Sequence, residues 1–568
     1  MLYSTWQLSF DHVEQQNRLS AKLLRLWAYF DNQDLWFELL RHSDSTDPDW
    51  VRELVKDELS FHGAVRVLSD HGLVEVDKSS QERIESSGYS IHGCVHSWTI
   101  HVLNQEWDHD LARIAVKFVG LHILGEQAIR PWLTQRRLLH HAARCSYIAL
   151  NGLVIDNGIE WAYNNLGDLY SDQGKLAEAE QMYQRALQGY EKAWGLEHTS
   201  TLDTVNNLGN LYADQGKLAE AEQMYQRALQ GKEKAWGLEH TSTLVTVNDL
   251  GSLYTIQGKL VEAEQMYQRA LQGYEKAWGP EHTSTLHTVS NLGNLYADQG
   301  KLAEAEQMYQ RALQGYEKAW GPEHTSVLHT VNDLGSLYTI QGKLVEAEQM
   351  YQRALQGYEK AWGPEHTSTL DTVNNLGNLY VDQGKLAEAE QMYQRALQGY
   401  EKARGPEHTS TLDTVNNLGN LYADQGKLVK AEQMYQRALQ GMEKARGPEH
   451  TSTLVTVNNL GNLYTDQGKL VKAEQMYQRA LQGYEKAVGV DNVTTYPPAL
   501  DTAKNLGSLF EHQGDIAKAR TMYSRAFLGS EIVFGPDHPR SQSLRDKVGA
   551  LDVVIKDKAL IGVEEPVD

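Results

Sequence analysis

Asparagine returns at one spacing along most of this chain. From Asn164 onward the interval is 42 residues, and Ser290 is the one member of the series that is not an asparagine. A primary amide both donates and accepts hydrogen bonds, so a row of amides can hold the backbone of an extended peptide. We therefore predict peptide contacts at Asn164, Asn206, Asn248, Asn332, Asn374, Asn416 and Asn458.

Two further polar rows keep the same spacing. A second amide row is Asn210, Asn294, Asn378, Asn420 and Asn462, and a carboxylate row is Asp214, Asp298, Asp382, Asp424 and Asp466. Basic residues are nearly absent from these positions, so a clamp for a C-terminal carboxylate is not expected. The rows favour a neutral or basic peptide as partner.

Other groups that could do chemistry are few. His92, Cys94 and His96 could form a metal cluster, but we favour ordinary packing for them. The histidines of the recurring "EHTS" are about one repeat apart, and nothing groups them as catalysts. A phosphate loop requires G-x-x-x-x-G-K-[ST], whereas "GNLYADQGKL" has six residues between its glycines and leucine after the lysine. We expect no catalytic residues, no metal, no cofactor and no nucleotide binding.

The spacing comes from a repeated unit. Copies centred on Leu166, Leu208, Leu250, Leu292, Leu334, Leu376, Leu418 and Leu460 follow one another every 42 residues, and a ninth centres on Leu506. A fixed period of this size indicates a solenoid.

Each unit is expected to form two helices. In the second copy, helix A is predicted from Thr201 to Asp214, and Gly216 ends it. Helix B, "LAEAEQMYQRALQGYEKA", consists of strong helix formers with apolar residues on one face. Ser200 or Thr201 is predicted to cap helix A. Because neither helix buries its apolar face alone, neighbouring units must stack.

From Asp203 to Asp214 and in the matching stretches of copies two to eight, differences between the copies are confined to one face of helix A. If Leu208 is position 7, the variable positions are 2, 5, 6, 9, 12 and 13. At about 100° per residue they fall within an arc of about 120°, opposite the leucines, valine and tyrosine that face helix B. Free drift of exposed residues is one explanation. Helix B hardly varies, however, although residues 248–284 recur unchanged at 332–368 and duplication contributes to the sameness. A surface altered for recognition is the other explanation.

The repeat resembles the tetratricopeptide repeat. Leu208, Gly209, Tyr212, Ala221 and Tyr225 match its alternation of small and large residues, and the length of 42 with "QGK" and "G.EH" is similar to the kinesin-light-chain type. The resemblance implies an all-α fold, a right-handed superhelix of about nine helix-turn-helix repeats. It also implies that the variable face of helix A lines a concave groove in which extended peptides bind.

Residues 1–105 differ from the repeats. "RLSAKLLRLWAYFD" and "SFHGAVRVLSDHG" are predicted as helices, and "LVEVD" and "YSIH" as short strands of a winged-helix-like domain. Arg66 is the single basic residue of the second helix, so DNA reading is not expected. "TWQLSFDHV", "AKLLRLWAYFD" and "YSIHGCVHSWT" resemble the segment that follows the nucleotide-binding domain in fungal NOD-like receptors, with Gly93 in place of a frequent acidic residue.

Bulk composition narrows the partners. The formal net charge of −22 disfavours nucleic acid and anionic membrane surfaces. No apolar run approaches a membrane span and no secretory segment is seen, and Cys94 and Cys145 are the only cysteines. A cytoplasmic location is expected.

These observations predict four segments: a winged-helix-like domain at 1–105, a helical connector and cap at 106–158, repeats at 159–548, and a capping segment and tail at 549–568. The predicted function is a protein-interaction scaffold, the sensor part of a NOD-like signalling receptor without its nucleotide-binding domain. The alternative is a cargo adaptor like kinesin light chain, which should carry a heptad coiled coil before the repeats.

Overall fold

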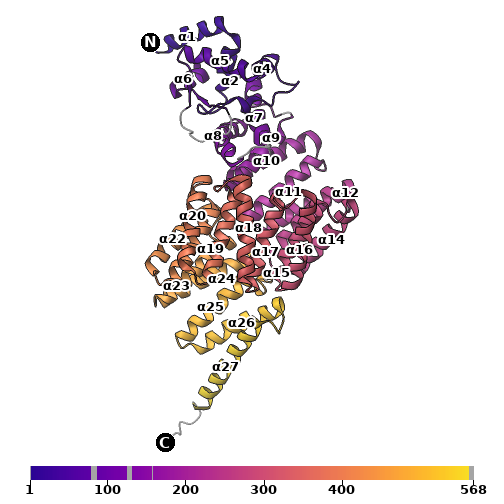
Figure 1. Cartoon of the computed structure of the whole chain (residues 1–568), viewed down its shortest axis with the longest axis vertical. Coiled ribbons are helices and arrows are strands. Elements are labelled where there is room, and N and C mark those ends of the chain that lie inside the picture. Colours follow the sequence, from indigo (N-terminus) through magenta and orange to yellow (C-terminus); the bar gives the residue numbers. More distant parts are fainter. Residues whose placement is uncertain (1, 78–85, 124–130, 157, 562–568) are drawn as a thin grey trace. The chain divides into compact units, whose positions relative to one another are not determined.

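The computed structural model describes the chain except residues 1, 78–85, 124–130, 157 and 562–568 (Figure 1). It divides into two compact units, residues 1–204 and 205–568. The predicted boundaries at 105, 158 and 548 remain predictions.

The first unit begins with short helices and one hairpin. Strands β1 (Glu75–Val76) and β2 (Tyr89–Ser90) pair antiparallel, with Val76 opposite Tyr89. Most of the predicted wing lies outside the described residues. The order of elements is the one expected for a winged helix, which stays a prediction. The helices are α1 (Leu2–Gln16), α2 (Arg18–Trp27), α3 (Phe37–Leu40), α4 (Asp49–Leu54), α5 (Glu58–Asp70) and α6 (Gly93–Trp98), followed by a π-helical turn, η1 (Thr99–Leu103).

Helices α7 (His109–Ile123) and α8 (Pro131–Leu150) are tied to these elements by charged contacts. The Arg137 guanidinium donates to both carboxylate oxygens of Asp34, at 2.7 and 2.8 Å, and lies 4.0 Å from the centre of the Trp36 ring. Lys117 Nζ donates to Asp47 at 2.9 Å, and both side chains are buried. Because a buried ammonium is tolerated only when it is paired, this contact fixes α7 against the segment before α4.

The repeats form an all-α array, as predicted. Helices A are α9 (Glu160–Asp172), α11 (Thr199–Asp214), α13 (Thr241–Ile256), α15 (Thr283–Asp298), α17 (Thr325–Ile340), α19 (Thr367–Asp382), α21 (Thr409–Asp424), α23 (Thr451–Asp466) and α25 (Pro497–His512). Helices B are α10 (Leu176–Trp194), α12 (Leu218–Trp236), α14 (Leu260–Trp278), α16 (Leu302–Trp320), α18 (Leu344–Trp362), α20 (Leu386–Ala403), α22 (Leu428–Arg446), α24 (Leu470–Val488) and α26 (Ile516–Phe534). A short 3-10 turn, η2 (Asn492–Thr494), lies in the insertion before α25, and α27 (Pro539–Ile561) ends the array.

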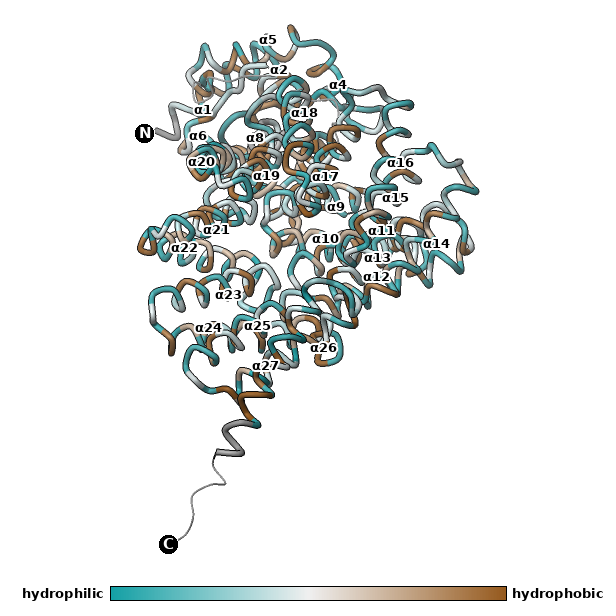
Figure 2. Tube along the Cα trace, turned by 60° about the horizontal axis from the view of Figure 1, so that its bottom comes forward, coloured by the Kyte–Doolittle hydropathy of each residue, from teal (hydrophilic) through white to brown (hydrophobic). Residues whose placement is uncertain are grey.

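The two helices of a repeat approach closely because each presents a glycine to the other. A Cβ added to Gly335 of α17 would lie 2.8 Å from the Tyr351 ring of α18, and one added to Gly357 would lie 2.4 Å from Leu328. Tyr351 and Leu328 are buried at these contacts. Figure 2 shows the resulting alternation of hydrophobic and hydrophilic residues along the helices. The invariant core of each copy is therefore a packing requirement.

Helix A begins two residues earlier than predicted, and the cap is different. In the second copy the helix starts at Thr199, and Nδ1 of His198 accepts a hydrogen bond from the Ser200 N–H at 3.3 Å. The same histidine cap recurs in later copies, for example His366 with the Ser368 N–H at 3.2 Å. The prediction that Ser200 or Thr201 caps the helix is therefore wrong, because the histidine ring reaches the free N–H first. The recurring "EHTS" is a capping motif.

Helix B is held to the next helix B by ion pairs. In each case an arginine of one copy meets a glutamate of the copy before it, and a lysine meets a glutamate in the preceding loop. The arginine pairs are Arg269–Glu233, Arg311–Glu275, Arg353–Glu317, Arg395–Glu359, Arg437–Glu401 and Arg479–Glu443. The lysine pairs are Lys276–Glu239, Lys318–Glu281, Lys360–Glu323, Lys402–Glu365, Lys444–Glu407 and Lys486–Glu449.

These pairs give the sameness of helix B a structural cause. A substitution of one member of an ion pair would leave the other member, in the neighbouring copy, without its counter-charge. The contrast between an invariant helix B and a variable helix A is therefore no argument for recognition, and the case for a binding surface must come from the variable face itself.

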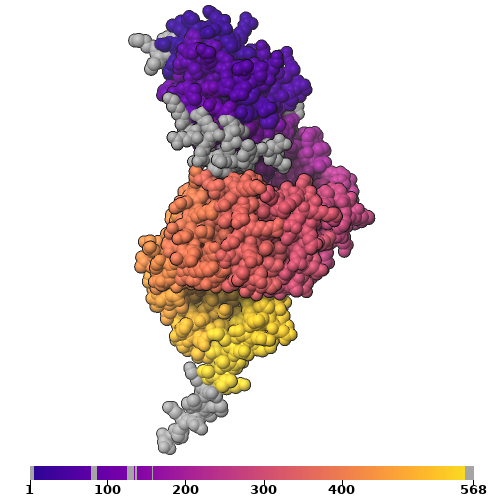
Figure 3. Space-filling model, in the orientation of Figure 1, coloured from indigo at the N-terminus to yellow at the C-terminus, as the bar shows by residue number. Residues whose placement is uncertain are grey.

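Within the second unit, early and late repeats also touch. A Cβ on Gly216, after α11, would lie 2.7 Å from the His450 ring before α23, and one on Gly258 would lie 3.4 Å from Tyr496. The turn at Gly300 lies beside Phe534 and His538. The space-filling view shows the closely packed repeats of this unit, coloured from magenta to yellow (Figure 3). The array is thus a superhelix whose successive turns are in contact.

Candidate functional site

The asparagine row at position 5 forms a ladder between repeats. Asn374 Oδ1 accepts a hydrogen bond from Nδ2 of Asn417, at position 6 of the next copy, at 3.3 Å. The same bond joins Asn248 to Asn291, Asn332 to Asn375, Asn416 to Asn459 and Asn458 to Asn505. Two members bond differently: Asn164 accepts from the Thr204 hydroxyl at 3.3 Å, and Asn206 donates to Asp249 at 2.8 Å.

This geometry changes the role expected of the row. Asn206, Asn248 and Asn416 are buried, and the other members are half-buried. The prediction treated all seven as exposed amides, which is wrong because the stacking of helices A brings positions 5 and 6 within hydrogen-bond distance. The row joins repeats, and its binding of peptide stays a prediction.

The second amide row supports the core of its own repeat. Asn210, Asn294, Asn378, Asn420 and Asn462 are exposed, and each accepts a hydrogen bond from the hydroxyl of a helix B tyrosine. Copies with serine at this position keep the contact, as Ser336 and the Tyr351 hydroxyl do at 2.9 Å. The exchange of asparagine for serine here therefore preserves a structural bond.

The carboxylates of the row at the end of helix A reach solvent, but neighbouring groups surround each of them in part. Burial among neighbouring groups raises the pKa of Asp298 to about 6. It also raises the pKa of Asp382, Asp424 and Asp466. Burial raises the pKa of Asp214 too, and the nearby Arg446 acts to lower it. The row thus places carboxyl groups at the ends of successive helices A, and their contact with a peptide stays a prediction.

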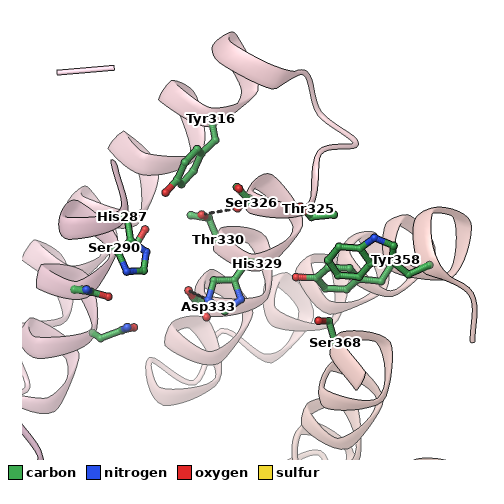
Figure 4. A pocket seen from close by; sticks show the side chains of 13 residues that line it. His287, Ser290, Tyr316, Thr325, Ser326, His329, Thr330, Asp333, Tyr358 and Ser368 are labelled. Atoms are coloured by element: carbon green, nitrogen blue, oxygen red, sulfur yellow. Dashed lines mark hydrogen bonds and ion pairs between the residues drawn. The ribbon is translucent and has the colours of Figure 1, made fainter. Parts of the chain in front are cut away.

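Two adjoining pockets lie on the variable face of the middle repeats. The α15–α17 pocket, about 260 Å³, is lined by residues of α15, α16, α17, α18 and the start of α19 (Figure 4). The α13–α15 pocket, about 350 Å³, is lined from α13 to the start of α17. Both include His287, Tyr316 and Ser326, so they form one continuous depression.

Residues that depart from the common repeat gather in these two pockets. His287 and His329 are the histidines at position 2, Ser290 is the serine at position 5, and Asp249 and Asp333 are the aspartates at position 6. In Figure 4, His287, His329 and Asp333 face the space between α15 and α17. The sequence places these departures on one face, and the structure brings them to one place on it.

The carboxylates of the two pockets differ in their neighbours: Asp249 has an amide and a lysine near it, and Asp333 has a histidine. Asp249 accepts from Asn206 at 2.8 Å, and the Lys232 ammonium also lowers the pKa of this carboxyl against the upward effect of burial. Asp333 is met by His329 Nε2 at 3.7 Å, and burial raises its pKa. Burial and the neighbouring His329 lower the pKa of His287.

Further along the array, arginines of the chain itself lie near the aspartates of the variable face. Asp371 accepts a hydrogen bond from the Tyr400 hydroxyl, and Arg404 opposes the rise that burial causes in its pKa. Burial raises the pKa of Asp413 to about 6, and Arg446 opposes it. Arg404 and Arg446 stand where earlier copies have tryptophan, such as Trp362.

Sequence reasoning missed the helix B members of this surface. Lys232 replaces the tyrosine found as Tyr274, Tyr316 and Tyr358, and two arginines replace tryptophan. These departures could have been found by comparing the last turn of helix B between copies. Their proximity to position 2 of helix A depends on packing, so it could not have been found from the sequence.

Metal-ligand grouping and helices that could span a membrane were sought in the part of the chain that the structure describes. Within it, no three histidine, cysteine, aspartate or glutamate side chains are grouped for a metal ion, and no helix is long and apolar enough to cross a membrane. The candidate His92, Cys94 and His96 separate: His92 caps α6, Cys94 is exposed, and His96 Nε2 lies 3.1 Å from the Phe30 carbonyl oxygen.

Solved structures with related folds come from several sources. A kinesin-light-chain-type protein of Podosopora anserina with nearly identical TPR-like repeats is 23% identical, with a TM-score of 0.31 over 36% of this chain and 96% of its own. A signal-transduction ATPase with a tetratricopeptide-repeat sensor, from Pyrococcus horikoshii, is 15% identical, with a TM-score of 0.37 over 95% of this chain and 67% of its own. A Rap protein complexed with competence and sporulation factor is 14% identical, with a TM-score of 0.45 over 69% of this chain and 99% of its own.

No curated protein matches the sequence. Family profiles described as tetratricopeptide repeat match residues 158–234, 242–318, 325–402, 409–486 and 500–540, which is more than half of the chain. Such repeats form scaffolds for protein–protein interaction. Together with the paired helices and the superhelix, these matches mean that the chain belongs to the tetratricopeptide-repeat family.

Proposed function

We propose that this protein binds an extended peptide of a partner protein on the variable face of helices A, with the two pockets of α13 to α19 as the centre of the site. One observation carries the proposal. The residues that distinguish the middle copies from the others, His287, Ser290, His329 and Asp333 among them, line the same depression. Packing between repeats does not require these residues, since other copies pack without them.

The surroundings of the pockets suit a peptide. Exposed asparagines at position 9 and aspartates at position 13 continue the polar face on both sides of the depression. Tyrosine rings from the last turns of helices B, Tyr316 and Tyr358, provide apolar surface beside these polar groups. A site of this kind combines orienting hydrogen bonds with aromatic contact area. The carboxylates favour a neutral or basic peptide.

A sensor role in a NOD-like signalling receptor extends this proposal. Motifs in residues 1–105 support it by their resemblance to fungal receptors, and the cytoplasm is the matching location. Peptide binding would alter the curvature of the repeats, and the connector at 106–158 would pass that change to the winged-helix-like domain. A ligand can do this only if it binds the two curvatures with different affinity.

A cargo adaptor like kinesin light chain is the alternative, favoured by the length of the repeat. An adaptor should self-associate through a heptad coiled coil ahead of its repeats, and the sequence before residue 159 has no such heptads. Sedimentation of the purified chain separates the two. A stable dimer would favour the adaptor.

The experiment for the binding face uses changes that the array already contains. His287→Asp, His329→Asp and Asp333→Asn install residues found at the same positions as Asp371, Asp413 and Asn375. Wild type and this triple variant are screened against a displayed library of random twelve-residue peptides, and selected peptides are measured by calorimetry. We expect the variant to lose the peptides that the wild type selects.

A matched control changes the outer face of helix B. Gln394, Gln436 and Gln478 are exposed on helix B, away from the two pockets, and each donates to a glutamate one turn away, so their triple replacement by alanine should preserve binding. If the helix B variant loses peptide binding while the helix A variant keeps it, the proposed face is wrong.

A further inference from the structure

The ladder between repeats is interrupted at one junction. Position 5 of the fourth copy is Ser290, which donates to its own helix at the Leu286 carbonyl, 3.2 Å away. Position 6 of the next copy is Asp333, which forms no hydrogen bond with it. At the equivalent junction two copies earlier, Asn206 donates to Asp249 at 2.8 Å. The serine thus removes the amide donor and leaves its acceptor in place.

Asp333 is a desolvated carboxylate without a lysine or arginine partner among the described residues. Its side chain is 17% exposed, and its contact with a charged group is the His329 ring at 3.7 Å. Among the described residues, no lysine or arginine pairs with it. A buried carboxylate in this condition is costly unless a donor or cation reaches it. Three other aspartates of this face, Asp249, Asp371 and Asp413, have an asparagine, tyrosine or cationic neighbour.

The space beside Asp333 is open to a ligand. The α15–α17 pocket of about 260 Å³ is bounded by the Tyr316 and Tyr358 rings and by Trp362. His287 lies in the same pocket, and no hydrogen bond holds its ring in the described part of the chain (Figure 4). Aromatic rings beside a carboxylate are the surroundings that a guanidinium or ammonium group prefers.

We propose that the α15–α17 pocket binds the side chain of an arginine or lysine of the peptide, with Asp333 as its ion-pair partner. The inference rests on the proposed function, because it names the ligand residue that the depression recognises. The interrupted ladder makes this junction different from the others. Where Arg404 and Arg446 approach Asp371 and Asp413, the chain supplies the cation itself.

A metal ion and an anion fit the pocket less well. His287, His329 and Asp333 carry ligand atoms, but no three such side chains among the described residues are close enough to hold a metal. An anionic side chain would meet the largely buried Asp333 carboxylate, and the two like charges would repel each other. A cation removes the electrostatic cost that the site now carries.

The test compares variants in the same peptide selection. Asp333→Asn removes the charge and installs the residue present as Asn291 and Asn375. Ser290→Asn restores the amide that position 5 has elsewhere, which should donate to Asp333 and fill the pocket. The matched control is Asp413→Asn, an acid of the same face that already has Arg446 beside it.

We expect wild-type protein and Asp413→Asn to select peptides with arginine or lysine fixed at one position. Asp333→Asn and Ser290→Asn should lose that preference, and a selected peptide should bind them more weakly by about tenfold or more, since one partner of a desolvated charge pair is lost. Replacing its arginine by citrulline should weaken binding to wild type alone.

The outcomes separate the two claims. Selection of peptides without a fixed basic residue, or with one that Asp333→Asn leaves unchanged, overturns the inference and leaves the binding face intact. Failure of the wild type to select any peptide overturns the proposed function, and the inference falls with it.

Discussion

Nδ2 of Asn417 lies 3.3 Å from Oδ1 of Asn374, one repeat earlier in the chain. The two side chains belong to the face that varies between copies, yet they bond helix to helix. Part of the variable face therefore also joins neighbouring repeats, and this determines how variants of the face should behave.

Replacement of Asn374, Asn416 and Asn458 by alanine should lower stability. Each change removes the acceptor of one amide bond between repeats, at a cost of about 0.5–1.5 kcal/mol per bond. Chemical denaturation of the purified chain measures the sum. The helix B triple, Gln394, Gln436 and Gln478 to alanine, is the control and should change the free energy of unfolding by less than about 0.5 kcal/mol per site. Equal effects of the two triples would argue against the ladder.

Asn294→Ala should destabilise its own repeat by about 1–2 kcal/mol, because the Tyr309 hydroxyl loses its acceptor inside a packed interface. Asn294→Ser should cost less, since Ser336 contacts the Tyr351 hydroxyl at 2.9 Å in the next copy. Thermal unfolding of both variants checks the order. An alanine variant as stable as the serine variant would show that the tyrosine hydroxyl needs no partner.

Tyr309→Ala should cost about 3–5 kcal/mol, because a large ring that is 3% exposed leaves a cavity. Hydrogen exchange should loosen α15 to α18 first. Because the turn at Gly300 lies beside Phe534 and His538, exchange should also rise near these residues. Loosening confined to adjacent repeats would show that the turns of the superhelix do not support one another.

The histidine caps should make stability depend on pH. Burial and the nearby Arg404 lower the pKa of His366 to about 4, below the usual value near 6.5. Between these values the unfolded chain binds more protons, so stability falls as the pH is lowered through this window. His366→Asn keeps an acceptor for the Ser368 N–H and does not titrate. The free energy of unfolding of the wild type, measured relative to that of His366→Asn, should therefore be smaller at pH 5 than at pH 7.

Asp298 gives the opposite sign and serves as the control. Its pKa is raised by burial to about 6, so the folded chain binds more protons between about 4 and 6. The stability of wild type relative to Asp298→Asn should rise as the pH is lowered through 6. The same sign for both variants would contradict the two pKa shifts.

Purified protein should show no saturable binding of ATP at micromolar concentration by calorimetry. The sequence contains no phosphate loop, and its nearest approach, "GNLYADQGKL", spans the end of a helix A and the turn after it. A one-site isotherm would contradict the motif argument.

The helices and the variable face could be predicted because both follow from periodicity. The helix B motif was expected to end at the alanine of "YEKA", and in the first copy the helix runs one residue further, to Trp194. The cap by His198 could not be predicted, because it depends on the backbone angles just before the helix. The bond between Asn374 and Asn417 joins residues 43 positions apart, and it depends on how far one helix A is shifted against the next. Such offsets are set by tertiary packing, which the pattern of one repeat does not contain.

The amide ladder has a consequence for how such a chain can change in length. Since most junctions use the same asparagine donor and the same asparagine acceptor, the end of one copy fits the start of almost any other. Whole copies can then be lost, gained or reordered at the level of the gene while every seam remains bonded, and only the order of side chains offered to a ligand is rewritten. Rearrangement of existing copies can therefore change which ligand the surface recognises, at little cost to folding.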